Sequence, residues 1–234
     1  MHILTIAAHP DDPELFCGGT LLRYADAGHS LFIALTTSGN IGSTTHASRE
    51  EIAAVREAEA LAGAERLGAQ VRFLRFDDEG LRDTEEARRA VLEAMRWAEP
   101  DVILTHHPSD PSTDHAMTAR LATQMIISLP APLSPVAEPP CDKKPSLFFW
   151  DVLAGGDFRP EAYVDISATF DRKLQALACH DSQVSWMGEF MEDGLPELTE
   201  AINRYRGAQV GVRYAEAFAA HRLHGFMPDF RLLP

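Results

Sequence analysis

The sequence predicts an α/β fold, a Rossmann-like and mostly parallel sheet with helices on both faces. Short β-rich runs alternate along the chain with longer segments of helical periodicity, which is typical of βαβ units. Right-handed crossovers then arrange such units as a Rossmann-like sheet. The chain has 234 residues, 45% of them hydrophobic, which suits one domain large enough to bury a core. We therefore expect a single domain over residues 1–234.

The same patterns predict the individual elements in chain order. Strands are expected in the β-rich runs at residues 2–8, 31–37, 71–76, 101–106, 147–152 and 163–167. Helical periodicity predicts helices at residues 18–27, 48–67, 84–98, 115–128, 169–180 and 197–222. Ser48, followed three residues later by Glu51, resembles a capping box at the start of the second helix. The segment 129–145 holds six of the 15 prolines, so it is expected as a surface loop or the edge of a lid.

The charge and the cysteines exclude several classes of protein. The chain has 35 acidic and 21 basic residues and a formal net charge of -14, which repels phosphate backbones and anionic lipids. We therefore expect no nucleic acid and no membrane as partners. Apolar runs stay well below the roughly 18 residues of a membrane span, and no basic region precedes the first one. Three cysteines without CxxC spacing indicate neither a disulfide framework nor a thiolate zinc site, so a cytoplasmic location is expected.

Polar side chains gather directly after two of the predicted strands. His9, Asp11 and Asp12 follow the first strand, and the segment 106–115 follows the fourth. In a strand order 3-2-1-4-5 these two strands are neighbours at the crevice where ligands bind, beyond the carboxyl ends of the strands. His9, His115 and one carboxylate of the adjacent aspartates then converge as three ligands of one metal ion, with a fourth position open for water. The alternative is a turn with solvated acids that caps the next helix.

Several stretches of the chain resemble one known family. "AHPDDPE", from Ala8 to Glu14, resembles the AHPDDxE signature of the zinc-dependent deacetylases of the PIG-L/LmbE type, which remove acetyl groups from N-acetylated sugars. "VREAEALAGAERLG" is similar to the family's arginine-bearing helix, and "THHPSDPSTDH" to its second metal motif. "FRPEAYVDIS", "RKLQALACHDSQ" and "YAEAF" are similar to its C-terminal half. The resemblance implies a zinc-dependent deacetylase that assembles as a homotrimer or homohexamer.

The resemblance also implies roles for individual residues. His9, Asp12 and His115 are then the zinc ligands, and Asp11 is the general base that takes a proton from water. Arg56 is then a residue that reaches the substrate or holds the catalytic carboxylate. From the sequence around it, Arg56 can equally form a solvent-exposed salt bridge on a charged helix face. Two imidazoles and one carboxylate also suit ferrous iron, so the choice of zinc depends on the resemblance.

The chain departs from the family at one position of the second metal motif. Many members have HPDH there, with a histidine that stabilises the oxyanion, whereas this chain has Ser112 at that place. His106 and His107 follow the fourth strand, and because adjacent strand residues point to opposite sides, at most one faces the crevice. His106 is expected to bind substrate. His180, in an "HDSQ" element similar to one in the family, is expected as a catalytic proton shuttle, with a histidine at a helix C-terminus as the alternative.

The predicted function is hydrolysis of the acetyl group of an N-acetylated amino sugar or sugar conjugate, with Asp11 activating water at the metal. The partner is a small N-acetylated sugar. One alternative is a carbohydrate-binding protein of the same fold whose catalysis is impaired, suggested by Ser112. A second is an amidase for a different N-acylated amine. A third, a metal phosphoesterase, is disfavoured by the net charge and by the lack of a glycine-rich phosphate loop.

Overall fold

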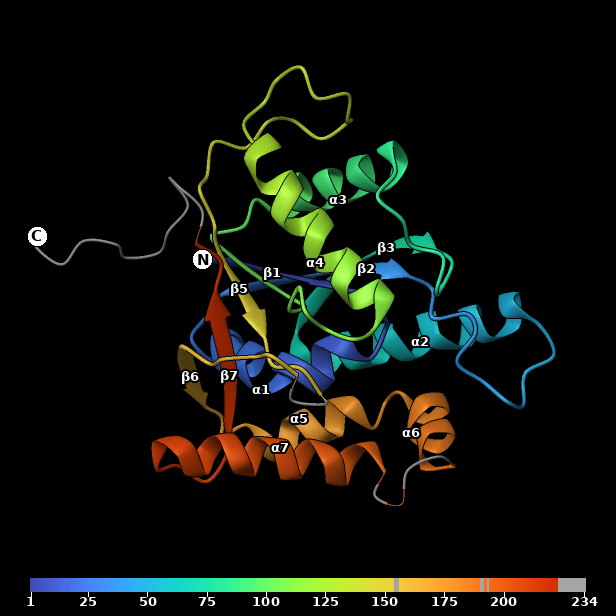
Figure 1. The fold of residues 1–234 in the computed structure, drawn as a ribbon, viewed down its shortest axis with the longest axis vertical. Coiled ribbons are helices and arrows are strands. Elements are labelled where there is room, and N and C mark those ends of the chain that lie inside the picture. Colours follow the sequence, from blue (N-terminus) through green and yellow to red (C-terminus); the bar gives the residue numbers. More distant parts are fainter. Residues whose placement is uncertain (154–155, 190–191, 193, 223–234) are drawn as a thin grey trace, which may run out of the picture.

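A computed structural model describes residues 1–153, 156–189, 192 and 194–222 of the chain. This part contains a seven-stranded sheet with the order β3-β2-β1-β4-β5-β7-β6 (Figure 1). The strands are β1 (His2–Ala7), β2 (Ser30–Thr37), β3 (Ala69–Phe76), β4 (Val102–Thr105), β5 (Ser146–Trp150), β6 (Ala162–Asp165) and β7 (Ala215–Ala220). The first five strands run parallel, and β7 is antiparallel to both of its neighbours. The predicted Rossmann-like sheet and the order 3-2-1-4-5 are confirmed.

Helices cover both faces of the sheet, as predicted (Figure 1). They are α1 (Asp12–Asp26), α2 (Arg49–Leu67), α3 (Glu85–Ala98), α4 (Thr113–Met125) with the 3-10 turn η1 (Ile126–Ser128), α5 (Phe170–Leu177), α6 (Asp181–Gly188) and α7 (Leu195–Val210). α3 and α4 lie on one face, and α1, α2, α5 and α7 lie on the other. The expected capping of α2 is present, because the Ser48 side chain accepts the N–H of Glu51.

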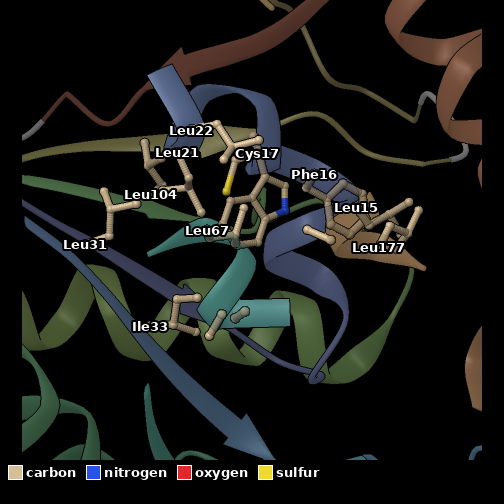
Figure 2. Packing of buried hydrophobic residues seen from close by; sticks show 14 of the residues in the cluster. Leu15, Phe16, Cys17, Leu21, Leu22, Leu31, Ile33, Leu67, Leu104 and Leu177 are labelled. Carbon is tan, nitrogen blue, oxygen red and sulfur yellow. The ribbon is translucent and has the colours of Figure 1, made fainter. Parts of the chain in front are cut away.

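The hydrophobic core is split by the sheet into two clusters. On one face Ile3 belongs to a cluster with leucines of α1 and α2 and with Phe16. Figure 2 shows these leucines and Phe16. On the other face Leu4 packs against α3 and α4, for example against Val91 and Leu121. Neighbouring residues of β1 therefore point to opposite clusters, as the period of a strand requires. Each fully buried aliphatic side chain contributes about 1.5–3 kcal/mol, so β1 is firmly anchored and its carboxyl end is a rigid support for the segment that begins at Ala8.

The predicted helix 197–222 is wrong in its second half. α7 ends at Val210, Gly211 has a left-handed φ of 76°, and the chain then forms β7. The alanine-rich segment Ala215–Ala220 favours a helix by propensity, but pairing with β5 and β6 completes the sheet and overrides this preference. Two further differences concern the helices. α1 begins at Asp12 instead of residue 18, with Pro13 in its first turn, and α6 was not predicted.

The proline-rich segment 129–145 is irregular, as predicted. It connects η1 to β5 and therefore lies at the amino ends of the strands, away from their carboxyl ends. Buried Arg96 holds it by donating to the carbonyl oxygens of Ser128, Leu129, Ala131 and Glu138. It is a surface loop and does not edge a lid over the carboxyl ends. Across the described ranges, every helix is too short or too polar to cross a membrane.

Candidate metal centre

The site forms where two neighbouring parallel strands end. β1 pairs with β4 up to Ile6 opposite Thr105. The segment after β1 carries His9 and passes directly into α1, while the segment after β4 leads to α4 with His115 in its first turn. Because parallel strands present their carboxyl ends at the same edge of the sheet, the two segments meet there. The predicted convergence of distant residues is therefore present.

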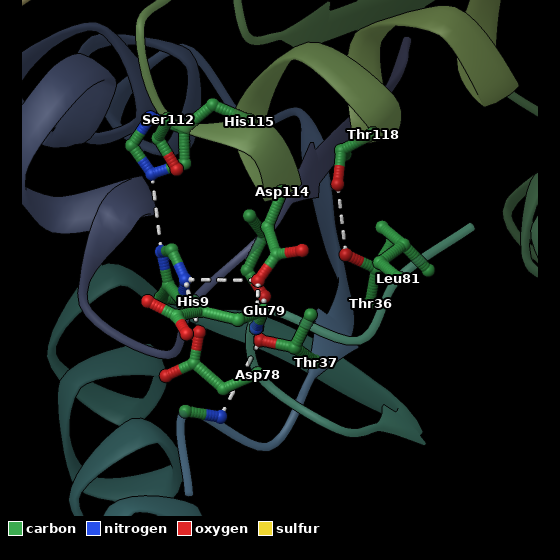
Figure 3. Close-up of polar contacts among 12 residues, drawn as sticks. His9, Thr36, Thr37, Asp78, Glu79, Leu81, Ser112, Asp114, His115 and Thr118 are labelled. Carbon is green, nitrogen blue, oxygen red and sulfur yellow. Dashed lines mark hydrogen bonds and ion pairs between the residues drawn. The ribbon is translucent and has the colours of Figure 1, made fainter. Parts of the chain in front are cut away.

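Three side chains aim their ligand atoms at one point. His9 Nδ1 lies 3.0 Å from His115 Nε2 and 3.5 Å from Asp12 Oδ2. His115 Nε2 lies 3.5 Å from Asp12 Oδ1. Zinc ligands at about 2.0–2.2 Å in a tetrahedron are roughly 3.3–3.6 Å from one another. The two imidazoles face each other in Figure 3, and these donor atoms fit a divalent cation with nitrogen and oxygen ligands.

Carboxylates stand behind both imidazoles. His9 Nε2 lies 3.1 Å from Asp78 Oδ1 and 3.8 Å from Asp114 Oδ2, and His115 Nδ1 lies 3.1 Å from Asp110 Oδ2. Such carboxylates hold the proton on the outer ring nitrogen and leave the inner one free to bind a metal. Sequence reasoning missed Asp78 and Asp110. Asp78 follows β3 at the same edge of the sheet, so the topological argument used for His9 would have found it.

The charges of the cluster also fit a cation. Burial raises the pKa of the Asp12 carboxyl, but His115, His106 and His9 outweigh burial and hold this pKa well below its usual range. Burial lowers the pKa of His115, but Asp12 and Asp110 outweigh it and raise the pKa to about 9. Positive charge next to Asp12 is therefore favourable. Protons on the histidines or a bound metal ion can supply it.

Asp11 is the N-cap residue of α1 and is fixed by Arg56. Arg56 Nη2 donates to Asp11 Oδ1 at 2.7 Å, and Nη1 donates to the Gly39 carbonyl at 3.0 Å. Arg56 is only 3% exposed, so the alternative of a solvent-exposed salt bridge is wrong. Gly39 has a left-handed φ of 60°, and a Cβ there would lie 2.2 Å from Arg56 Nη1. The guanidinium thus occupies space that only glycine leaves open.

His106 is fully buried behind the metal ligands. Its Nε2 lies 2.9 Å from the Ala8 nitrogen and 3.1 Å from Asp12 Oδ2, and its Nδ1 accepts from Trp150 Nε1. Its ring stacks on that of His115 with centroids 3.9 Å apart. The prediction that His106 binds substrate does not fit this position, because the chain itself surrounds the ring. The contacts instead support Asp12 and His115 from behind.

His180 is also fully buried. It follows α5 as the N-cap residue of α6, and its Nε2 lies 3.3 Å from Glu14 Oε2. Gly63 on α2 makes room for this pair, because a Cβ there would lie 2.6 Å from Glu14 Oε1 and 2.9 Å from His180 Nε2. His180 therefore contacts α1 behind Asp11, and the predicted proton shuttle would have to act through Glu14.

A cavity of about 460 Å³ opens above the ligand atoms. We call it the site cavity; its described lining residues are His9, Asp11, Asp12, Leu15, Ile41, Gly42, Arg56, Asp78, Glu79, Pro111, Ser112, Thr113, Asp114, His115, Leu153, Gln183, Trp186, Met187 and Leu195. Of the predicted site residues, His9, Asp11, Asp12, Arg56 and His115 meet in it, whereas His106 and His180 lie behind it. Its volume suits a small-molecule ligand.

Comparison with known proteins identifies a family for this chain. The model of the PIG-L family, described as GlcNAc-PI de-N-acetylase, matches residues 4–126. Diacetylchitobiose deacetylase of Thermococcus kodakarensis is 30% identical, with 92% of this chain and 80% of that protein covered. A 4-oxalmesaconate hydratase of Pseudomonas putida is 26% identical, covering 77% and 73%. The crystal structure of a conserved Thermus thermophilus protein superimposes with a TM-score of 0.82 at 30% identity, covering 100% of both chains.

Proposed function

Because this chain belongs to the PIG-L family, we propose that it is a metal-dependent deacetylase that hydrolyses the acetamido group of a small amino sugar or sugar conjugate. The observation that carries the proposal is the convergence of His9 Nδ1, His115 Nε2 and the Asp12 carboxylate beside Asp11 in one cavity. A metal site adjoining a carboxylate base is the arrangement that amide hydrolysis by water requires.

The residues that hold the metal in this proposal are His9, Asp12 and His115. We propose zinc, since two imidazoles and a carboxylate are a ligand set of catalytic zinc sites, with ferrous iron as the alternative for the same ligands. When bound, the ion polarises the acetyl carbonyl and makes water more acidic. His106 supports Asp12 through its Nε2, 3.1 Å from Asp12 Oδ2.

Asp11 moves the proton in this reaction. Its carboxylate takes a proton from the water that adds to the acetyl carbon, and it returns that proton to the sugar nitrogen when the C–N bond breaks. The products are acetate and the free amine. Arg56 Nη2 donates to Asp11 Oδ1 at 2.7 Å, which fixes the direction of the carboxylate. Glu14 on α1 pairs with buried His180, whose Nε2 lies 3.3 Å from Glu14 Oε2, and Asp11 acts electrostatically on both groups.

The charge of the site cavity favours the binding of a neutral sugar over the binding of a polyanion. Its described lining residues include five carboxyl groups, those of Asp11, Asp12, Asp78, Glu79 and Asp114. Arg56 is the one lysine or arginine among the same residues, and it already binds Asp11 and Gly39. A ligand carboxylate about 4 Å from one of these acids is repelled by roughly 1–4 kcal/mol, whereas the amine product is attracted.

A hydratase is the second candidate, because one relative carries that name at 26% identity. Addition of water to a double bond would use the same metal and base. The name of that relative denotes a carboxylate substrate, however, and the five acids of the site cavity disfavour such a ligand. The same charges disfavour the phosphoesterase.

Metal exchange tests the proposal. The purified protein is treated with a chelator, dialysed and reloaded with zinc or ferrous iron, and acetate release is measured with a panel of N-acetylated sugars. We expect acetate release that chelation abolishes and zinc restores. Sugar binding without acetate would instead identify a carbohydrate-binding protein, and release from non-sugar acetamides alone would identify a different amidase. Loss of absorbance from an unsaturated dicarboxylate would identify a hydratase.

We also propose a cytoplasmic location and a homotrimer or homohexamer. All three cysteines are free thiols, which suits a reducing compartment. Ile127 and Leu133 are 59% and 94% exposed and supply apolar surface for contacts between subunits. Light scattering coupled to gel filtration tests the assembly, because a monomer would exclude it. Fractionation of the source cells tests the location.

A further inference from the structure

Gln183 is a buried polar residue that the proposed mechanism leaves unused. Within α6, whose residues are all described, it is the one buried residue, with 3% of its surface exposed. Its Nε2 donates to the Gly42 carbonyl at 2.9 Å. The helix itself is anchored on α2, because the backbone nitrogen and hydroxyl of Ser182 donate to the two oxygens of Glu59, at 2.8 and 2.7 Å. Gln183 therefore holds the Gly42 carbonyl against a fixed support.

A continuous chain of hydrogen bonds leads from Gln183 to the proposed base. After the bond from Gln183 to Gly42, the Gly42 nitrogen donates to the Gly39 carbonyl at 3.4 Å. The same carbonyl accepts Arg56 Nη1 at 3.0 Å, and Arg56 Nη2 donates to Asp11 Oδ1 at 2.7 Å. The bonds cross from α6 to the loop after β2, then to α2 and to the start of α1. We call these four bonds the Gln183–Asp11 chain.

The glycine in the middle of this chain is crowded from two sides. A Cβ at Gly42 would lie 2.8 Å from Gln183 Oε1 and 3.1 Å from Arg56 Nη1, so both side chains pack against the same residue. Arg56 Nε is buried and has no hydrogen-bond partner among the residues that the structure describes. The direction of the guanidinium therefore depends on its bonds to Gly39 and Asp11, and a shift of the Gly39 carbonyl changes it.

From these contacts we propose that Gln183 is a positioning residue, which directs the Asp11 carboxylate through the loop after β2 and Arg56. This inference rests on the proposed deacetylase function, in which Asp11 moves the proton. It deepens that function, because it makes the packing of α6 a condition for the correct direction of the base. Supporting hydrogen bonds of this kind hold a reacting group in its productive geometry.

Steady-state kinetics on the metal-loaded protein tests the proposal. Gln183→Met keeps the length of the side chain and removes the donor. We expect kcat to fall about tenfold or more, since misplacing a reacting group by about 1 Å can cost about 100-fold, with KM and metal content unchanged. Thr44→Val is the matched control: Thr44 Oγ1 donates to Glu189 Oε2 at 3.1 Å, outside the chain of bonds, and kcat should stay unchanged. A raised KM at unchanged kcat would make Gln183 a substrate contact and overturn the proposal.

A second substitution shows whether Gln183 acts through Arg56. In Arg56→Lys a single ammonium group replaces the planar fork that binds Gly39 and Asp11 together. We expect Gln183→Met to lower kcat by less than about twofold in this background, because the chain of bonds is already broken. Equal losses in both backgrounds would mean independent effects and overturn the proposal. If Gln183→Met melts early, Gly42→Ala displaces both neighbouring side chains and is expected to lower kcat to the same extent.

Hydrogen exchange tests the chain of bonds without turnover. Exchange of the Gly42 amide, which donates to Gly39, is followed by NMR. We expect it to be about tenfold faster in Gln183→Met and unchanged in Thr44→Val. Faster exchange without acetate release from any sugar, by the unchanged protein included, overturns the deacetylase and retains Gln183 as the residue that orders Arg56. Acetate release with kcat and exchange unchanged in Gln183→Met overturns the positioning role and leaves the deacetylase standing.

Discussion

Two buried charged clusters of this chain differ in how completely the protein satisfies them. Around Lys173, which is fully buried, every partner is part of the chain: Nζ donates to Glu216 Oε1 at 2.6 Å and to Asn203 Oδ1 at 2.9 Å. Glu216 also accepts the backbone N–H groups of Gly19 and Thr20. At the metal centre, two imidazole nitrogens instead face each other 3.0 Å apart beside a carboxylate.

This difference distinguishes a cluster that stabilises the fold from a cluster that can bind a metal ion. The Lys173 cluster connects α1, α5, α7 and β7 and needs nothing from outside, so its loss should affect folding alone. The metal centre has carboxylates on its outer side, Asp78 and Asp110, each 3.1 Å from an outer imidazole nitrogen, and leaves its inner atoms directed at one point. Buried polar atoms that are poorly satisfied by the chain are costly in a folded protein, and a metal ion relieves that cost. Substitutions in the Lys173 cluster should therefore lower stability, whereas substitutions at the metal centre should lower metal binding or activity.

The largest expected effect is the loss of metal in His115→Ala. One of three ligands disappears, and the remaining pair, His9 and Asp12, cannot hold the ion at stoichiometric level. Elemental analysis after gel filtration should find little metal, and acetate release should fall to background. His107→Ala is the control, because His107 belongs to the same segment but contacts Ser109 instead of the ligands. Full metal content in His115→Ala would remove His115 from the ligand set.

Asp11→Asn should separate catalysis from metal binding. Asparagine keeps the shape of the side chain and an oxygen for Arg56, but it cannot take a proton from water. We expect kcat to fall by about 10²–10⁴-fold, the usual contribution of a general base, with stoichiometric metal and little change in KM. Metal analysis and steady-state kinetics on the same preparation check both parts. Undiminished turnover would assign the base to another residue.

The parallel part of the fold and the metal ligands could be predicted because they depend on local pattern and on topology. Apolar runs set the first five strands, and the topological rule brings the residues after β1 and β4 together. β7 could not be predicted in this way. Its segment, Ala215–Ala220, is rich in alanine. It forms a strand because it pairs with β5 and β6 and because Glu216 forms an ion pair with Lys173.

The exposure of individual histidines could not be predicted from the sequence. His106 is buried because Trp150 packs against its ring from β5, and His180 is buried because Gly63 on α2 leaves space for it. Both causes lie more than 40 residues away along the chain, so the sequence around each histidine carries no sign of them. The role of Arg56 was undecided for the same reason, since its carboxylate partner, Asp11, lies 45 residues away along the chain.

Breaking the other cluster should change stability and leave the metal centre intact. Lys173→Met removes the ammonium group and leaves Glu216 buried without its charged partner, which typically costs about 3–5 kcal/mol of unfolding free energy. Urea unfolding measures the loss, and metal content per folded protein should stay unchanged. Arg172→Met is the matched control on the same helix, because its ion pair with Asp26 is exposed and is worth under about 1 kcal/mol. Equal losses in both variants would contradict the comparison.

The smallest expected effect is that of Asp78→Asn, a change at a carboxylate that contacts a metal ligand without being in the proposed ligand set. Asp78→Asn keeps an oxygen 3.1 Å from His9 Nε2 but removes the charge that makes the imidazole a stronger ligand. Loss of such a supporting carboxylate typically lowers metal affinity about 10–100-fold, which competition with a fluorescent chelator measures. Asp77→Asn is the matched control, since the neighbouring Asp77 carboxylate accepts from Asn40. If Asp78→Asn lost stability and kept its metal affinity, Asp78 would be a structural partner like Glu216, because only a residue that acts through the ligand changes the affinity.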